Sequence, residues 1–295
     1  MKVQNNIQRI SFKAGLTPSI KVQAARYSAA NIERLFRNEG VNASFKNNRA
    51  IAYCCGIVND IFETLTTKYK LPFGAKPPSV TVYNDLELIN YSDTGCLGFC
   101  LPDSAKIISG KGAYEARSVF YNNEKMKTLT EMDALAESQH RSGFNSTNHF
   151  LHTIMHEWVH NIHNDLLYRV FGYDGTCPKT LQRYNTFNGV YYDPNPYVSG
   201  IEHLKQMHAS RYTSEQREII KKEISEYAAG RRVRSGSIQG GNPFELIAET
   251  ITKEVVDVLN PDTLTVTRNP FYQAGKHDQK LADLINNAWY NIAGG

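Results

Sequence analysis

The sequence contains no long run of apolar residues. No stretch approaches the roughly 20 residues that a membrane-spanning helix needs, and the N-terminal segment has basic residues without the apolar core of a secretory signal peptide. We therefore predict no membrane span and take the cytoplasm as the default location, with export by a leaderless route left open. No block of Lys and Arg is long enough to form a nucleic-acid footprint and the net charge is only +4, so nothing in the composition indicates a nucleic-acid partner.

Cysteine is scarce, and its arrangement does not suggest disulfide bonds. The chain has five cysteines, an odd number, and Cys54 and Cys55 are adjacent, which favours a reducing compartment over a disulfide framework. Cys96 and Cys100 do not have the spacing of a zinc ribbon, so we interpret them as structural thiols. With 41% hydrophobic and 21% charged residues, the composition is that of an ordinary globular protein.

Secondary-structure patterns predict an α+β protein. Residues 1–20 are polar and are expected to form a flexible tail, whereas residues 21–295 are long enough for a single domain with a sizeable core. Residues 21–172 are expected to contain helices and a small sheet, and residues 173–295 are expected to be mostly helical. Helices are expected at residues 21–38, 47–70, 148–172, 213–229, 243–259 and 278–290, strands at residues 79–83, 105–109 and 118–121, and a polar connection at residues 122–146.

The most informative segment is residues 148–172, where apolar side chains recur at steps of three and four residues, as on an amphipathic helix. It contains the sequence His156-Glu157-Trp158-Val159-His160. Histidines four residues apart lie one above the other on a helix, so His156 and His160 can bind the same metal ion. Glu157 points about a quarter turn away, where it can act as a base on a metal-bound water. This pattern predicts a zinc site, and the alternative is a chance match to a short motif.

Other polar residues near this helix have less specific roles. Ser146 or Thr147 is expected to cap its N-terminus. His149, His152 and His163 lie on the face of the motif histidines. Positions seven apart on a straight helix are separated by about 10 Å along its axis, whereas a Zn–N bond is about 2 Å, so a third histidine of this helix cannot reach the same ion. We therefore interpret His163 as a residue of the polar face or a neighbour of a ligand.

A catalytic zinc ion takes three protein ligands and leaves its fourth position to water, so one more ligand is required. The better candidates are Glu245 and Glu249, one turn apart on a helix that Asn242 caps and Pro243 begins. One carboxylate can bind the metal while the other accepts the free ring N–H of a ligating histidine. In the alternative interpretation, Glu245 is a capping residue at the third helical position and Glu249 is a solvated surface residue.

These motifs together resemble the gluzincin zinc metalloproteases, most nearly the group formed by the catalytic domain of anthrax lethal factor and the Pro-Pro endopeptidases. The first point of resemblance is the H-E-x-x-H motif at residues 156–160, followed by a helix with the sequence Glu245-Leu246-Ile247-Ala248-Glu249. The second is Ser225-Glu226-Tyr227-Ala228, which corresponds to a segment that precedes the glutamate helix in that family.

The resemblance implies both a ligand set and a fold. It implies one zinc ion per chain bound by His156, His160 and Glu245, with Glu249 next to the ligands and Tyr227 stabilising the oxyanion. A core tyrosine is the alternative for Tyr227. The implied fold is zincin-like, with a small, mostly antiparallel sheet, an active-site helix and a helical C-terminal half. An extended peptide is expected to lie against the strand at residues 105–109.

We therefore predict a zinc-dependent metalloendopeptidase that acts on a peptide or protein substrate. Zinc lowers the pKa of its bound water, Glu157 takes the proton, and the resulting nucleophile attacks a peptide carbonyl. Two alternatives remain open: a zinc hydrolase of non-peptide amides or esters, and a non-catalytic binding protein in which zinc only stabilises the helices. A purely structural zinc site would have no need of Glu157.

A basic, Gly-rich segment at residues 231–241 separates Tyr227 from Glu245, and it is longer than the corresponding loop usually is in the resembling family. Such composition is typical of a flexible loop. We hypothesise that this segment gates the site or favours acidic residues in a substrate; a solvated loop without a role is the alternative.

Overall fold

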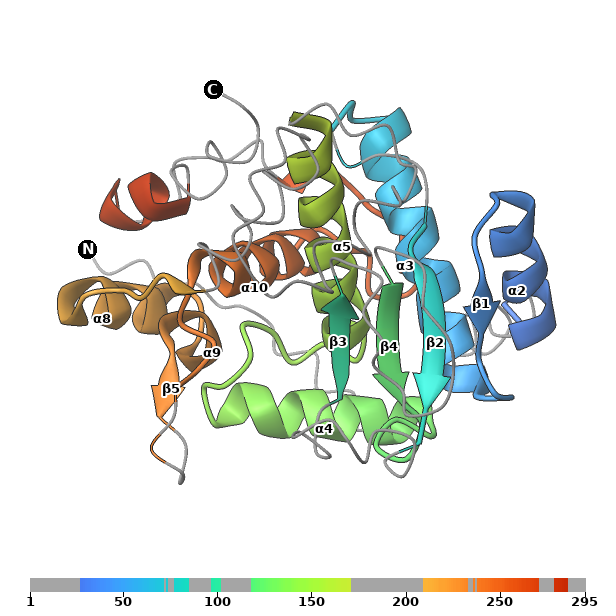
Figure 1. Ribbon diagram of the computed structural model, residues 1–295, viewed down its shortest axis with the longest axis horizontal. Coiled ribbons are helices and arrows are strands. Elements are labelled where there is room, and N and C mark those ends of the chain that lie inside the picture. Colours follow the sequence, from blue (N-terminus) through green and yellow to red (C-terminus); the bar gives the residue numbers. More distant parts are fainter. Residues whose placement is uncertain are drawn as a thin grey trace, which may run out of the picture.

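The computed structural model describes residues 27–71, 73, 77–84, 97–101, 118–170, 209–232, 236, 238–270 and 279–285. The expected tail at residues 1–20 and the expected strand at residues 105–109 lie outside these residues. Figure 1 shows α5 beside the sheet and α10 crossing α5, with α8 and α9 at one end of the molecule and α2 at the other. The described part of the chain is therefore helix-rich α+β, as the sequence predicts in outline.

A four-stranded mixed sheet lies between the helices. Its spatial order is β1 (Ala43–Ser44), β2 (Ser79–Tyr83), β4 (Ser118–Asn122) and β3 (Gly98–Leu101). The pairs β1–β2 and β2–β4 are parallel, and only β3–β4 is antiparallel. The expectation of a mostly antiparallel sheet is therefore wrong. β2 and β3 follow each other in the chain but do not pair, because β3 lies at the edge of the sheet. The fully buried β4 lies between them.

Two helices precede the sheet in the chain. α3 (Arg49–Thr67) confirms the helix expected at residues 47–70, with Asn48 capping it through a hydrogen bond from the backbone N–H of Ile51. α2 (Ala29–Asn38) confirms only the second part of the helix expected at residues 21–38, because it begins after its N-cap Ser28. α3 is buried along most of its length, since it packs against both α2 and α5. Cys54 and Cys55 are buried free thiols within it, as expected of structural cysteines.

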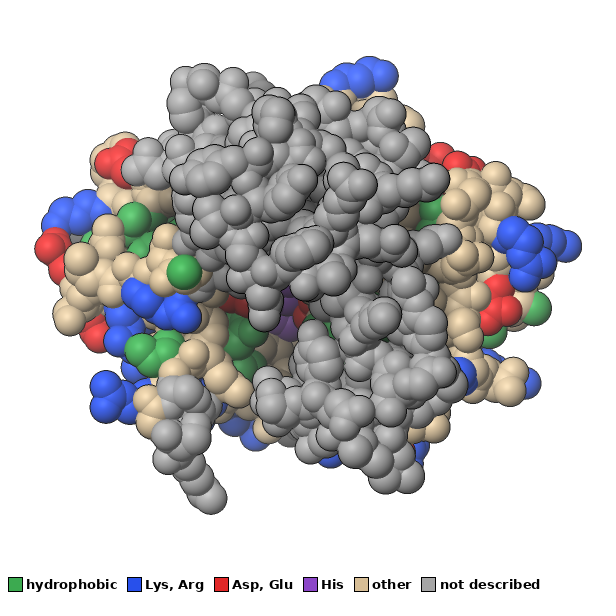
Figure 2. Space-filling view, viewed as in Figure 1, with side chains coloured by type: hydrophobic (Ala, Val, Ile, Leu, Met, Phe, Trp, Pro, Cys, Tyr) green, Lys and Arg blue, Asp and Glu red, His purple; other side chains and the backbone are tan. Residues whose placement is uncertain are grey.

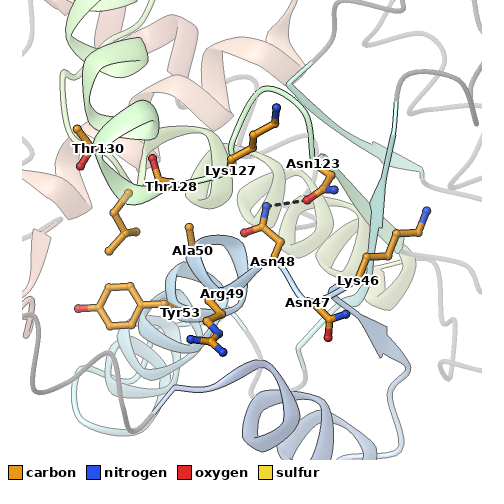
Figure 3. A pocket seen from close by; sticks show the side chains of 11 residues that line it. Lys46, Asn47, Asn48, Arg49, Ala50, Tyr53, Asn123, Lys127, Thr128 and Thr130 are labelled. Carbon is orange, nitrogen blue, oxygen red and sulfur yellow. Dashed lines mark hydrogen bonds between the residues drawn. The ribbon is translucent and has the colours of Figure 1, made fainter.

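The segment expected to be a polar connection contains a helix, α4 (Leu129–Arg141), capped by Thr128. Only Met132 and Ala136 are buried in it, so its apolar periodicity is too weak to recognise in the sequence. A hydrogen bond of 3.0 Å from Asn48 to the amide oxygen of Asn123 joins the start of α3 to the loop that leads into α4 (Figure 3).

The histidine helix α5 (His152–Val170) packs against β3, β4, α3 and α10 (Pro243–Val256). Trp158 and Val159, the variable positions of the motif, are buried in the core, and the indole of Trp158 lies 6.0 Å from the ring of Phe36. The phenol of Tyr121 on β4 donates a hydrogen bond of 3.0 Å to the carbonyl oxygen of Ile154. α5 is thus fixed to the sheet on one side and to α10 on another.

The helix expected at residues 213–229 is divided into α8 (Ser214–Glu223) and α9 (Glu226–Ala229). The capping box of Thr213 and Gln216 is confirmed. The division occurs at Ser225, whose hydroxyl caps α9 by accepting the backbone N–H of Ala228. This start of α9 is also held by the loop after α4, because the backbone N–H of Tyr227 donates to the carbonyl oxygen of Phe144.

The remaining described elements follow α9. β5 (Arg231–Arg232) and β6 (Ile238–Gln239) form a two-stranded antiparallel hairpin in the Gly-rich segment. Asn242 caps α10 and Pro243 begins it, as predicted, and residues 279–285 are helical. Within the described helices, none combines the length and the apolar character that crossing a bilayer requires.

Candidate metal centre

Two overlapping groups of buried side chains could hold a metal ion where α5 faces α10. One group is His156, His160 and Glu245, and the other is His152, His156 and Glu249. Both helices present side chains four residues apart, so the pairs match along the contact between the helices. The sequence predicted four of these five residues; His152 was set aside, although its four-residue spacing from His156 repeats the spacing of the two glutamates.

The first group has the geometry of an open tetrahedral site. The Nε2 atoms of His156 and His160 are 3.0 Å apart, and Oε2 of Glu245 lies 3.1 Å from each of them. A tetrahedral ion with bonds of about 2.0–2.1 Å separates its ligand atoms by about 3.3–3.4 Å. The three atoms therefore nearly match the spacing of three ligands of such an ion, with the fourth position left for another ligand. The predicted ligand set is brought together by the fold.

Glu249 faces the scaffold of this centre. Its Oε1 lies 2.9 Å from Nδ1 of His156 and 3.1 Å from Nε2 of His152. Its Oε2 accepts a hydrogen bond of 2.7 Å from the backbone N–H of Ser146. Histidine ligands commonly direct their second ring nitrogen at a carboxylate that orients the ring. The carboxylate of Glu249 lies within this reach of Nδ1 of His156, at an ion-pair distance without hydrogen-bond geometry, and His152 brings a second imidazole to the same carboxylate.

The expected capping of α5 by Ser146 or Thr147 is wrong. α5 begins at His152, and the hydroxyl of Ser146 donates to the carbonyl oxygen of Glu249 at 3.0 Å. The hydroxyl of Thr147 accepts the backbone N–H of His149, which is outside the helix. Both residues lie before an extra turn that separates them from the first helical residue, so their side chains hold the neighbouring loop and α10 instead.

The interpretation of His163 as a polar-face residue is also wrong. Its side chain is fully buried, and its ring is stacked on Phe244 with 5.0 Å between centroids. His160 is stacked on the same phenylalanine at 4.0 Å. Because α10 covers this side of α5, the face that carries the histidines is interior. Phe244 therefore supports the ring of His160 in its position beside His156.

The surroundings of the three glutamates give them different protonation preferences. Burial disfavours the ionised form of Glu245, but the nearby His160 and His156 outweigh it and lower the pKa of this carboxyl. Burial likewise opposes ionisation of Glu249, and His152 and His156 lower its pKa well below the usual value. Burial raises the pKa of Glu157 to about 8, because the nearby His156 offsets only part of the desolvation. Glu245 and Glu249 are thus suited to remain ionised, and Glu157 is suited to carry a proton.

The same carboxylates favour positive charge between them. Burial alone would lower the pKa of His156, but its contacts with Glu245 and Glu249 raise that pKa well above its usual value. This preference for positive charge is what a buried cation site requires, because an unpaired buried charge is costly.

The centre opens into a pocket of about 560 Å³. His156, Glu157 and Tyr227 contribute to its lining, and the ring centroids of His156 and Tyr227 are 5.8 Å apart. β3 forms another part of the lining at Gly98, where an added Cβ would lie only 3.0 Å from Cγ of Glu157. Figure 2 shows histidine and carboxylate side chains near the centre of this face of the molecule. The fold therefore brings the predicted base and the predicted oxyanion donor to one pocket.

A second pocket, of about 860 Å³, lies between the N-termini of α3 and α4 (Figure 3). Its described lining includes Lys46, Arg49 and Lys127 but no carboxylate and no histidine. This described lining offers none of the histidine and carboxylate groups that line the pocket at α5.

Comparisons of the chain with protein-family models, with curated proteins and with solved structures found no match.

Proposed function

We propose that the protein is a zinc-dependent metalloendopeptidase of the gluzincin type, with His156, His160 and Glu245 as the ligands of one zinc ion. The observation that carries this proposal is the triangle of two imidazole nitrogens and one carboxylate oxygen with sides of 3.0–3.1 Å. Two histidines and a glutamate are a typical ligand set of catalytic zinc, which keeps a fourth position open. Of the three, His156 lines the pocket of about 560 Å³ together with Glu157 and Tyr227, and this access supports a catalytic over a purely structural ion.

A zinc ion bound there would supply Lewis acidity, which polarises a carbonyl oxygen and lowers the pKa of water. Glu157 would act as the general base, taking a proton from the attacking water and passing it to the leaving amine. Burial raises the pKa of its carboxyl, and a zinc ion beside it would lower that pKa again, so Glu157 could take the proton in its ionised form and return it as an acid. Glu157 is also absent from both groups that could bind the ion, so this role is compatible with the ligand set.

Tyr227 would act as the donor to the developing oxyanion. It lines the same pocket as Glu157, and its backbone is fixed by the hydrogen bond from its N–H to Phe144. Preorganised donors of this kind are effective because they need no reorientation during the reaction. Glu249 would orient the ring of His156 through Nδ1, and His152 would hold Glu249 in turn.

The position of β3 supports a peptide as the substrate. β3 is the edge strand of the described sheet, and the pocket runs along Leu97 and Gly98 at its start. Glycine at position 98 leaves room next to Glu157, because any larger side chain would approach Cγ of that residue at 3.0 Å. An extended peptide lying along β3 would place a backbone carbonyl within reach of the zinc ion and of the water that Glu157 activates, which is the arrangement peptide hydrolysis needs.

The proposal is tested by metal analysis and peptide digestion of the wild type and Glu157→Gln, both purified without a His-tag. We expect one zinc ion per chain in both proteins and cleavage of a peptide library by the wild type only. Proteolysis that persists in zinc-loaded Glu157→Gln would contradict the assignment of the base. Bound zinc without any hydrolysis would favour a binding protein, and hydrolysis confined to small amides or esters would favour the non-peptide alternative.

A further inference from the structure

The hairpin between Tyr227 and Glu245 is attached to the backbone of Tyr227. β5 and β6 pair Arg231 with Gln239 and Arg232 with Ile238. At the base of the hairpin, the backbone N–H groups of Gly230 and Gly241 both donate to the carbonyl oxygen of Tyr227, at 3.2 and 3.0 Å. The described part of the Gly-rich segment is therefore an ordered extension of the proposed oxyanion donor.

Glycine is required at the junction. Gly240 has a φ of 66°, and an added Cβ would lie 2.0 Å from the carbonyl oxygen of Tyr227. No other L-residue fits there without moving the backbone. The guanidinium of Arg217 donates to the carbonyl oxygens of Ala229 and Gly230, which holds the other side of the base. The hairpin and Tyr227 are thus placed as one unit.

The two faces of the hairpin have different neighbours. The basic residue Arg231 lies 3.9 Å from Glu226 and covers the ring of Phe144 at 5.5 Å. Arg231 and Arg232 line a separate pocket beside α8. Ile238, Gln239 and Gly240 line the pocket at the metal centre instead. The described part of this lining contains no Lys or Arg, which gives no support to a preference for acidic substrates through Arg231 or Arg232.

The described lining of the pocket includes apolar surface beside its polar side chains. Ile238 is 37% exposed and is one of two large hydrophobic side chains exposed in the described part of the chain; the other is Leu35 on α2. Leu97 and Phe144 are the other aliphatic and phenyl side chains in the described lining. The ring of Tyr227 lies 4.9 Å from Phe144, and its Cδ2 is 3.2 Å from the Cβ position of Gly240. Tyr227 is therefore flanked by this apolar surface.

We propose that Ile238, together with Leu97 and Phe144, forms a subsite for an apolar side chain of the substrate, adjacent to the scissile bond. This inference deepens the proposed peptidase function and depends on it. A substrate side chain in this position covers the exposed surface of Ile238, and removal of apolar surface from water favours binding. Because the hairpin is joined to Tyr227, the side chain bound by Ile238 helps to set which peptide carbonyl faces the oxyanion donor.

The inference is tested by profiling cleavage of a peptide library with the wild type, Ile238→Ser, Ile238→Glu and the control Leu35→Ser. Leu35 has the same exposed fraction as Ile238 but is not among the described lining residues. We expect the wild type to prefer an apolar residue at one position next to the cleaved bond. Ile238→Ser should lower kcat/KM for such peptides by about tenfold, the usual effect of a lost apolar pocket contact. Ile238→Glu should shift the preference at that position towards Lys or Arg, and Leu35→Ser should match the wild type.

Zinc content serves as the second measurement, and it should be equal in all four proteins. The subsite would be overturned if Ile238→Ser cut the library with the same position-specific preference as Leu35→Ser and the wild type. The proposed function would still stand after that result. A library left uncut by the zinc-loaded wild type would overturn the proposed function and, with it, a peptide subsite at Ile238.

Discussion

The two ends of the contact between α5 and α10 contain the same kinds of side chain in different arrangements. At one end, Glu245 lies 3.1 Å from Nε2 of both His156 and His160. At the other end, Glu249 lies 2.9 Å from Nδ1 of His156 and accepts the backbone N–H of Ser146. Both glutamates are buried, and both have lowered pKa values. The ring nitrogen that each glutamate faces, and not its burial or charge, distinguishes the proposed ligand Glu245 from Glu249, which we propose to orient His156.

The largest effect should follow replacement of Glu245, the proposed ligand. Glu245→Ala removes one of three proposed ligands, so we expect zinc to be largely lost and peptide cleavage to fall to background. Metal analysis after exhaustive dialysis against a weak chelator measures this loss. A variant that retained one zinc ion per chain would show that the ion is held by the other group of residues.

A smaller effect should follow Glu249→Ala. The ligands stay in place, but the ring of His156 loses its orienting carboxylate, and we expect zinc affinity to fall by about 10–100-fold. Two buried imidazoles also lose their partner, so the free energy of unfolding should fall by about 1–3 kcal/mol. Competitive zinc titration and chemical denaturation measure the two quantities. The comparison between the two glutamates fails if Glu249→Ala loses zinc as completely as Glu245→Ala.

His152→Gln should have a smaller effect again, because the contact of His152 with Glu249 supports the carboxylate that faces His156. We expect a loss of zinc affinity below about tenfold, since an outer partner contributes less than the carboxylate it supports. The same titration compares this variant with Glu249→Ala and with the double variant. If His152 acts through Glu249, the double variant should bind zinc no more weakly than Glu249→Ala alone.

The smallest effect on zinc should come from the helix cap. The side-chain oxygen of Asn242 accepts the backbone N–H of Glu245 at 3.0 Å. Asn242→Ala should lower the free energy of unfolding by about 1 kcal/mol and leave one zinc ion per chain. Thermal unfolding with and without added zinc measures both. A loss of zinc as large as that of Glu245→Ala would mean that the cap, more than the helix packing, positions the ligand.

The sequence predicted the parts of the site that depend on local spacing. The H-E-x-x-H helix, the cap at Asn242 and the two glutamates one turn apart follow from helical periodicity and capping, which act within a few residues. The contribution of His152 was missed because it depends on the register between α5 and α10, which pairs positions 97 residues apart. Whether such a pair meets is set by tertiary packing.

The fold was predicted less completely for related reasons. Strand β2 was located correctly from its alternation, but its parallel pairing with β4 depends on β3 taking the edge of the sheet. α4 was missed because a surface helix with two buried residues leaves little periodic signal. The division between α8 and α9 comes from hydrogen bonds to the loop at Gly143 and Phe144, which compete with helix continuation at Ser225.

The burial of Trp158 within the motif has an optical consequence. The chain has only two tryptophans, and this one lies between the proposed base and the second histidine, in van der Waals surroundings that exclude water. If α5 moves away from Phe36, the indole meets solvent and its fluorescence emission shifts to longer wavelength. The fluorescence of Trp158 in the unlabelled protein therefore reports whether α5, the helix that carries the histidines, is packed against Phe36, and the measurement needs no substrate.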